Sequence, residues 1–181
     1  MDFMELVSLR RSVRKYAARA VESEKVSLCI EAARLAPSAS NGQPWRFILI
    51  DEMRLRDSVA RASFGPGTSF NRFVSGSPLL VVLVIEASTA LNRVGALIKR
   101  RKYPLIDIGI AAEHFCLRAA ELGLGTCMIG WFNEWKIKRL LRIPAARRIG
   151  LVIALGYPDE KDSPRPKQRK ATEAIFGRNG Y

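Results

Sequence analysis

Three arginines and a hydroxyl lie close together near the start of the sequence, in Arg10-Arg11-Ser12-Val13-Arg14. Guanidinium groups form paired, charge-assisted hydrogen bonds with phosphate and carboxylate oxygens, so this composition suits an anionic ligand. In an extended segment alternate residues face the same way, and Arg10, Ser12 and Arg14 would then converge on one ligand. Taken alone, a basic junction of this kind is more often solvated surface.

A second polar segment, Pro37-Ser38-Ala39-Ser40-Asn41-Gly42-Gln43-Pro44, follows a stretch with the apolar spacing of a helix. Its hydroxyl and amide side chains can bond an anion or a heterocycle. Turn-forming residues of this type also occur in ordinary loops that end helices. The chemistry of each segment therefore stays open when it is considered alone.

The order of these two segments, Arg-Arg-Ser-x-Arg and then Pro-Ser-x-x-Asn-x-Gln-Pro-Trp, resembles the nitroreductase family of flavoproteins. The resemblance continues at Asp107-Ile108-Gly109, from Ala119 to Thr126, from Ile153 to Pro158 and in Lys167-Gln168-Arg169-Lys170. It covers nearly the whole chain in the family's order, although no single motif is decisive.

The resemblance implies an α+β fold: a three-layer α-β-α sandwich with a mostly antiparallel central sheet and flavin mononucleotide (FMN) at the interface of a homodimer. It also implies an enzyme in which NADH or NADPH reduces FMN by hydride transfer. A nitro compound, a quinone or a similar acceptor then binds the same pocket, in a ping-pong sequence. No catalytic side chain is expected, because N5 of the flavin carries the chemistry.

The FMN contacts that the resemblance implies within one subunit involve the basic N-terminal segment and the tail. The phosphate, ribityl and ring contacts match Arg10, Ser12 and Arg14, with Arg11 in the same segment. The basic residues that close over the phosphate match Lys167 and Arg169. A guanidinium from Arg14 is expected to stabilise the negative charge of the reduced ring.

Other implied contacts come from three further segments. The loop that reaches in from the partner subunit matches Pro37, Ser38, Ala39, Ser40 and Gln43. The strand end whose backbone faces the flavin ring matches Met128, Ile129, Gly130 and Trp131. Asn71 matches a residue that bonds the pyrimidine edge of the ring.

Two positions depart from the family pattern. Many relatives carry glutamate where Gly130 stands, so a side chain beside N5 is missing here and the shape of accepted substrates is expected to differ. Ala171 replaces a common proline in the tail, which we expect to matter little.

The formal net charge of +13 comes from 30 lysines and arginines against 17 acidic residues. Such a balance suggests nucleic acid as a partner, but the basic residues are spread along the chain and no nucleic-acid motif is present. The run Lys99-Arg100-Arg101-Lys102 is interpreted as solvated surface near a lid, or alternatively as a site that attracts the 2′-phosphate of NADPH. A flavin-storage protein and a non-specific nucleic-acid-binding protein remain the alternatives to an enzyme.

The composition, with 181 residues of which 48% are hydrophobic, suits one domain over 1–181, with 159–181 as an extended tail. No apolar run is long enough to cross a membrane, and the start lacks the features of a signal peptide, so a cytoplasmic protein is expected. Cys29, Cys116 and Cys127 are expected to be buried free thiols. With His114 as the one histidine, a metal site is not expected.

The elements that must position these residues follow from hydrophobic periodicity and turn signals. Gly123 is expected to end the longest helix in a left-handed conformation, and Gly65-Pro66-Gly67 to form a flexible loop. His114 and Cys127 are interpreted as packing residues. Helices are expected over 2–9, 23–36, 54–62, 106–122 and 134–141, and strands over 45–50, 79–85, 126–131 and 149–156.

Overall fold

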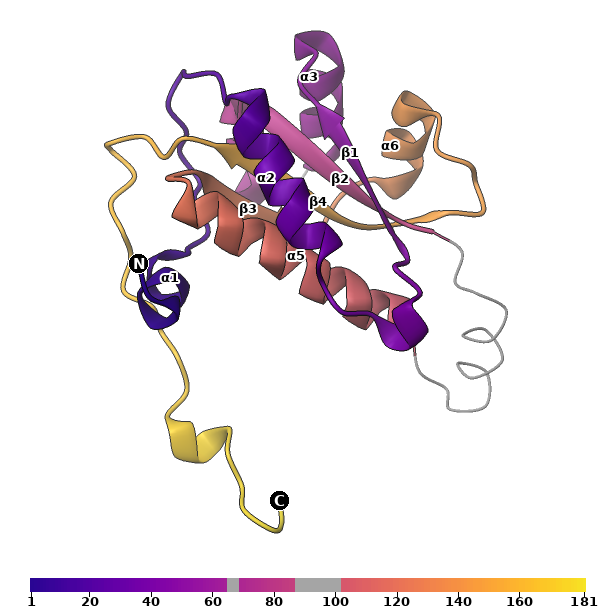
Figure 1. The fold of residues 1–181 in the computed structure, drawn as a ribbon. Helices are drawn as coiled ribbons and strands as arrows, with labels where there is room; N and C mark the ends of the chain where they lie inside the picture. Colours follow the sequence, from indigo (N-terminus) through magenta and orange to yellow (C-terminus); the bar gives the residue numbers. More distant parts are fainter. Residues whose placement is uncertain (65–68, 87–101) are drawn as a thin grey trace.

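The computed structural model describes residues 1–64, 69–86 and 102–181, so the expected loop at 65–67 and the basic residues 99–101 lie outside the described residues. Figure 1 shows a central sheet with helices on both of its faces. The described elements are α1 Phe3–Leu9, α2 Ser23–Arg34, η1 Ala39–Asn41, β1 Trp45–Ile50, α3 Met53–Ala62, η2 Ser69–Gly76, β2 Leu79–Ile85, α5 Tyr103–Glu121, β3 Gly125–Ile129, α6 Glu134–Leu141, β4 Arg148–Gly156 and η3 Thr172–Ala174.

The sheet has the strand order β1-β2-β4-β3, and every neighbouring pair is antiparallel. Strand β2 is apolar throughout because both of its faces are covered. Leu79, Val81 and Leu83 pack in the core formed with α2 and α5. Leu80, Val82 and Val84 pack in the core formed with α3 and α6. The expected α+β, α-β-α sandwich is confirmed (Figure 1).

The core under α2 and α5 contains Phe115, which is fully buried and stacks on Phe47 with ring centroids 5.9 Å apart. Nδ1 of His114 lies 3.3 Å from the carbonyl oxygen of Ala32, so this histidine joins the two helices, as expected of a packing residue. Burial raises the pKa of Cys29 to about 11 and that of Cys116 to about 12. These thiols are therefore poor nucleophiles at neutral pH.

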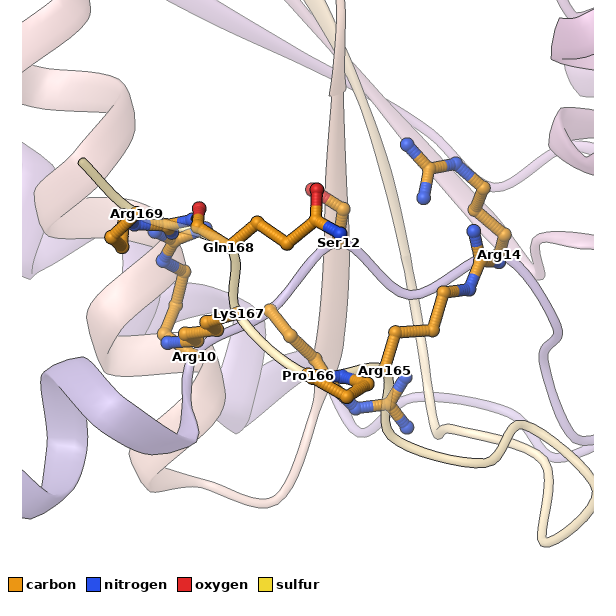
Figure 2. Close-up of a pocket in the computed structure, with 9 residues that line it drawn as sticks. Arg10, Ser12, Arg14, Arg165, Pro166, Lys167, Gln168 and Arg169 are labelled. Carbon is orange, nitrogen blue, oxygen red and sulfur yellow. The ribbon is translucent and has the colours of Figure 1, made fainter.

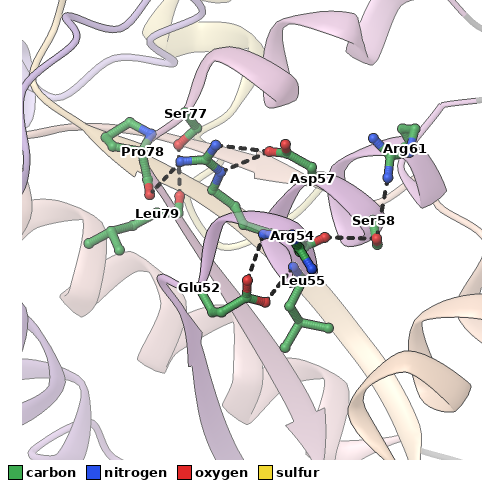
Figure 3. Close-up of polar contacts among 10 residues, drawn as sticks. Glu52, Arg54, Leu55, Asp57, Ser58, Arg61, Ser77, Pro78 and Leu79 are labelled. Carbon is green, nitrogen blue, oxygen red and sulfur yellow. Dashed lines mark hydrogen bonds and ion pairs between the residues drawn. The ribbon is translucent and has the colours of Figure 1, made fainter.

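Helix α3 lies on the opposite face of the sheet and begins at a side-chain cap (Figure 3). The Glu52 carboxylate accepts hydrogen bonds from the backbone N–H groups of Arg54 and Leu55, at 2.8 and 2.7 Å. Its inner face is apolar, with Val59 and Ala60 fully buried, while charged residues lie on its outer face, which is the pattern of a surface helix.

Several element boundaries differ from the sequence-based expectation. Helix α5 begins at Tyr103 rather than at Ile106, because Pro104 occupies the first turn, where its missing N–H removes no helical bond. Strand β3 ends at Ile129, so the prediction that it continues to Trp131 was wrong. Gly123 has a φ of +76° and ends α5 as expected.

After β4 the chain leaves the sandwich as the C-terminal tail (residues 159–181). It runs past α1 and ends away from the sheet (Figure 1). Every residue from 163 to 181 is exposed. Among the described residues, no helix is long and apolar enough to span a membrane.

Candidate functional site

A cavity of about 730 Å³ lies between the basic N-terminal segment and the tail (Figure 2). Its volume falls in the range of small-molecule and cofactor sites. Six of the residues predicted to bind FMN meet here, together with three tail residues that the sequence interpretation did not single out. The lining residues are Arg10, Arg11, Ser12, Arg14, Arg165, Pro166, Lys167, Gln168 and Arg169.

The sheet holds the N-terminal segment of this cavity in an extended conformation. Helix α1 ends at Leu9, and Ser12 then forms a parallel bridge with Thr126 of β3. The Val13 N–H donates to the Thr126 carbonyl oxygen at 2.9 Å, and the Val13 side chain is 2% exposed. With Val13 packed inward, Ser12 and Arg14 on either side of it are exposed and line the cavity.

The cavity walls carry a large excess of positive charge. Nε of Arg10 lies 3.2 Å from a Glu113 carboxylate oxygen, and Nζ of Lys167 donates to the Val7 carbonyl oxygen at 2.6 Å. Partial burial, together with the nearby charges of Arg10 and Arg169, lowers the pKa of Lys167. An anion held between these cations would relieve their mutual repulsion.

Arg11 lines the same cavity, but its guanidinium is bound by the chain's own tail. One terminal nitrogen forms an ion pair with the Asp162 side chain, and the other donates to the Asp162 carbonyl oxygen at 2.8 Å. The Asp162 side chain is 6% exposed. Arg11 therefore differs from Arg14, whose guanidinium lies 5.7 Å from the ring of Phe73 and reaches the cavity from its other side.

The polar loop 37–43 lies at the N-terminal end of α5, whereas α1 lies at the opposite side of the molecule (Figure 1). The Ala39 N–H donates to Asp107 of α5 at 3.1 Å, and the Ser38 hydroxyl accepts from the Gln43 N–H at 2.9 Å. Ser40 and Gln43 adopt positive φ angles of 49° and 43°. None of residues 37–43 lines the cavity of their own chain.

Comparisons with known proteins agree with this arrangement. The sequence profile described as the nitroreductase family matches residues 7–157. A solved nitroreductase family protein from Clostridium novyi NT is 30% identical, with a TM-score of 0.76, and the match covers 91% of this chain and 89% of that one. This chain belongs to the nitroreductase family.

A second solved structure and a sequence relative are also similar to this chain. A solved FMN-dependent nitroreductase from Clostridium difficile R20291 is 26% identical with a TM-score of 0.79, over 99% of this chain and 100% of that one. A protein of Archaeoglobus fulgidus with the provisional name NADH dehydrogenase/NAD(P)H nitroreductase is 29% identical over 170 residues, which are 89% of this chain and 88% of that protein. As a nitroreductase, the protein is an oxidoreductase.

The backbone after β3 is held in this nitroreductase by Asn71, which is buried in η2. Its amide nitrogen donates to the carbonyl oxygens of Trp131 and Ser63, at 3.0 Å each. Because both N–H groups have partners, a bond from Asn71 to a ligand would use its carbonyl oxygen, which is an acceptor. Gly130 lies beside Trp131, and a Cβ atom built on it would meet no other atom within 4 Å.

Strand β3 adjoins the N-terminal segment of the cavity through the bridge between Thr126 and Ser12, and Cys127 is the next residue of this strand. Burial raises the pKa of this thiol, although the charge of Arg14 and a bond with Ser12 oppose the shift. Met128 and Ile129 complete the strand, with Ile129 packed against α3 and α6. Within the described part of the chain, no group of histidine, cysteine and acidic residues is suited to hold a metal ion.

The sequence interpretation missed Arg165, Pro166 and Gln168 as cavity residues. A signal for them existed, because the basic run from Arg165 to Lys170 is one of the densest in the chain. Their position depends on how the tail folds back toward α1, and no local pattern in an exposed segment specifies that path.

Proposed function

We propose that this nitroreductase binds FMN and uses NADH or NADPH to reduce nitro compounds, quinones or similar acceptors in a ping-pong reaction. The observation that carries the proposal is the cavity between the N-terminal segment and the tail. It combines six basic side chains and the Ser12 hydroxyl around a space of cofactor size. The name of the Clostridium difficile neighbour, an FMN-dependent nitroreductase, supports the same cofactor.

The residues present fit the phosphate of FMN. That group is a dianion, and Arg10, Lys167 and Arg169 converge on one side of the cavity (Figure 2). Charge-assisted hydrogen bonds from such donors are the strongest that a protein offers to a phosphate. Ser12 would then bond the ribityl chain, and Arg14 would lie toward the ring. When bound, FMN supplies the hydride-transfer chemistry.

The chain's own residues would orient the cofactor and stabilise the negative charge of its reduced ring. Arg14, which lines the cavity, would place a guanidinium near the ring and so stabilise the negative charge of the reduced form. Asn71 fixes the backbone of Trp131, and the segment Met128–Trp131 would present main-chain N–H groups to the ring. Gly130 leaves open space in which a flat acceptor can approach.

The second half of the site is proposed to come from a partner subunit. Within one chain, loop 37–43 contacts Asp107 near the start of α5 and does not line the basic cavity, so Pro37, Ser38, Ala39, Ser40 and Gln43 would reach FMN across a dimer. Helices α1, α2 and α5, the residue after α2 and the residues after η3 also expose large apolar side chains. Where such side chains gather in a patch they mark protein interfaces; those exposed here include Phe3, Met4, Leu28, Leu35, Leu105, Ile106, Ile175 and Phe176.

In this proposal residues 1–181 form one domain, and its tail 159–181 extends toward the partner. Helix α1 supports the same idea, because none of its residues is buried in the single chain. The run Lys99–Lys102, of which residues 99–101 lie outside the described residues, is proposed as solvated surface near a lid or, alternatively, as a site that attracts the 2′-phosphate of NADPH.

The absorption spectrum of the purified protein tests the proposed function. We expect a yellow dimer with the bands of bound FMN, which NADPH or NADH bleaches without oxygen and which a quinone restores. Bound flavin that neither nucleotide bleaches would indicate a storage protein instead. A colourless protein that cannot take up FMN, and whose retention on DNA falls steeply with salt, would indicate nucleic-acid binding.

A further inference from the structure

The Asp162 side chain is the last buried group before the tail becomes fully exposed. Residues 163–181 are exposed throughout, whereas Asp162 is 7% exposed. Lys167 and Arg169, which approach the phosphate side of the cavity, follow a few residues later. The position of Asp162 therefore decides where these two cations can reach.

Asp162 is fixed by contacts at its backbone and its side chain. Its N–H donates to the Asp159 carbonyl oxygen at 2.8 Å, and the Asp159 N–H donates to the Lys15 carbonyl oxygen at 3.1 Å. Arg11 binds both the carboxylate and the carbonyl oxygen of Asp162. The planar guanidinium makes these two contacts together, which a lysine ammonium does not reproduce.

We infer that Arg11 is a positioning residue rather than a direct ligand of the phosphate, and that its pair with Asp162 is a latch for the tail. The latch places Lys167 and Arg169 over the cavity, so that the site favours flavin carrying a phosphate over flavin lacking one. This inference rests on the proposed function, because it assigns roles within the proposed FMN site.

The charges around Arg11 support this assignment. Asp162 neutralises the guanidinium and is itself buried, so a phosphate would have to displace a well-placed carboxylate to bind Arg11 directly. Breaking a buried ion pair leaves an uncompensated charge, which is strongly unfavourable. Among the described residues, Arg10 has a single-nitrogen ion pair with the more exposed Glu113, and Lys167 and Arg169 donate to backbone carbonyl oxygens, so none of the three is held at two points by one buried residue as Arg11 is.

The substitution Asp162→Asn distinguishes a positioning role of Arg11 from a direct contact between Arg11 and the phosphate. If Arg11 acts through the tail, the substitution weakens the latch and raises the Kd for FMN about tenfold, because the tail cations must be ordered on binding. If Arg11 binds the phosphate directly, removing a neighbouring carboxylate leaves the Kd unchanged or lowers it. Arg11→Gln is expected to weaken FMN binding in either case and serves as the positive control.

The affinity for riboflavin, which lacks the phosphate, shows whether a substitution affects only the phosphate contacts or distorts the whole flavin site. The latch predicts that Asp162→Asn changes the Kd for riboflavin by less than about twofold, since Lys167 and Arg169 have no phosphate to bind. An equal loss for FMN and riboflavin would show that the substitution distorts the whole site, and would overturn the inference.

A matched control exists on the other face of the sheet, where Arg56 pairs with Asp57 at 2.8 Å and also lies 3.4 Å from the Pro78 carbonyl oxygen. Asp57→Asn makes the same chemical change away from the cavity and should leave both flavin affinities unchanged. Should Asp162→Asn fail to fold, Asp162→Glu keeps the charge but moves the carboxylate, and it is expected to show a smaller selective loss for FMN; a direct phosphate contact of Arg11 predicts no such loss.

FMN binding by the wild type tests the proposed function, and the difference in FMN affinity between the wild type and Asp162→Asn tests the latch. A wild-type protein that does not bind FMN would overturn both. A wild-type protein that binds FMN, with an Asp162→Asn variant of equal affinity, would overturn the latch alone.

Discussion

The Val13 N–H donates a 2.9 Å hydrogen bond to the Thr126 carbonyl oxygen, which fixes the N-terminal segment of the cavity to strand β3. The contact is close because residue 125 is glycine. A Cβ atom on Gly125 would lie only 2.5 Å from Cγ2 of Val13. The position of Ser12 and Arg14 in the cavity thus depends on a backbone approach that only glycine permits.

Gly125→Ala is expected to push Val13 away from β3 and to displace the segment that holds Ser12. Overpacking of this kind destabilises proteins by about 1–3 kcal/mol, so thermal unfolding should shift downward and the Kd for FMN should rise. Gly76→Ala is the control, because a Cβ there would meet nothing within 4 Å. Equal stability and FMN affinity in the two variants would contradict this account of Gly125.

Arg14→Ala is expected to weaken FMN binding and to lower the midpoint potential of the bound flavin. The guanidinium favours the reduced, more negative ring, and losing about 1.4 kcal/mol of that preference lowers a two-electron potential by roughly 30 mV. Spectroelectrochemical titration of the variant measures the change, and Arg14→Lys should recover part of it. A potential equal to that of the wild type would rule out this role.

Gly130→Glu is expected to narrow the range of acceptors. The open space at Gly130 would be filled by a side chain, so kcat/KM for a bulky quinone should fall about tenfold relative to a small nitroaromatic. The Kd for FMN should change little, because the main-chain groups remain. A parallel change in kcat/KM for both acceptors would argue against a role in substrate shape.

Glu22 provides a test of pH dependence away from the cavity. A hydrogen bond from the Tyr157 hydroxyl, at 2.6 Å, is the main cause that lowers the pKa of Glu22 from 4.5 to about 2. Because the folded-state pKa is depressed, its stabilising effect is present above pH 4.5 and is lost as the pH falls toward 2. The melting temperatures of wild type and Glu22→Gln should therefore differ at pH 6 and converge near pH 2. A difference that is independent of pH would contradict this assignment.

Most of the fold could be predicted from the sequence, because its signals are local. The apolar run of β2 and the small residues of α5 predict a buried strand and a packed helix within a few residues of their observed bounds. Element η2 could not be predicted, because a short 3-10 segment has no hydrophobic periodicity long enough to recognise in the sequence. Just after the end of β3 at Ile129, the carbonyl oxygen of Trp131 is bound by Asn71, a contact between residues distant in sequence that no local pattern indicates.

The site was only partly predictable. Alternation in an extended segment placed Ser12 and Arg14 in the cavity, as the structure shows. The family resemblance placed Arg11 among the FMN contacts, but no pattern in the sequence indicates that Asp162 binds its guanidinium. That pairing depends on the turn at 159–162, where three-dimensional contacts rather than composition determine the path of the chain.

The central claim is that each FMN site is shared between two subunits, and a mixed dimer tests it most directly. One chain would carry Arg10→Ala, Lys167→Ala and Arg169→Ala; the other would carry Ser40→Glu and Gln43→Glu in the loop. Each variant dimer alone is expected to bind no FMN, while the purified mixed dimer regains one intact site and binds one FMN per dimer. A mixed dimer that binds no FMN would contradict a shared site. FMN binding by the homodimer of the loop variant would contradict it as well.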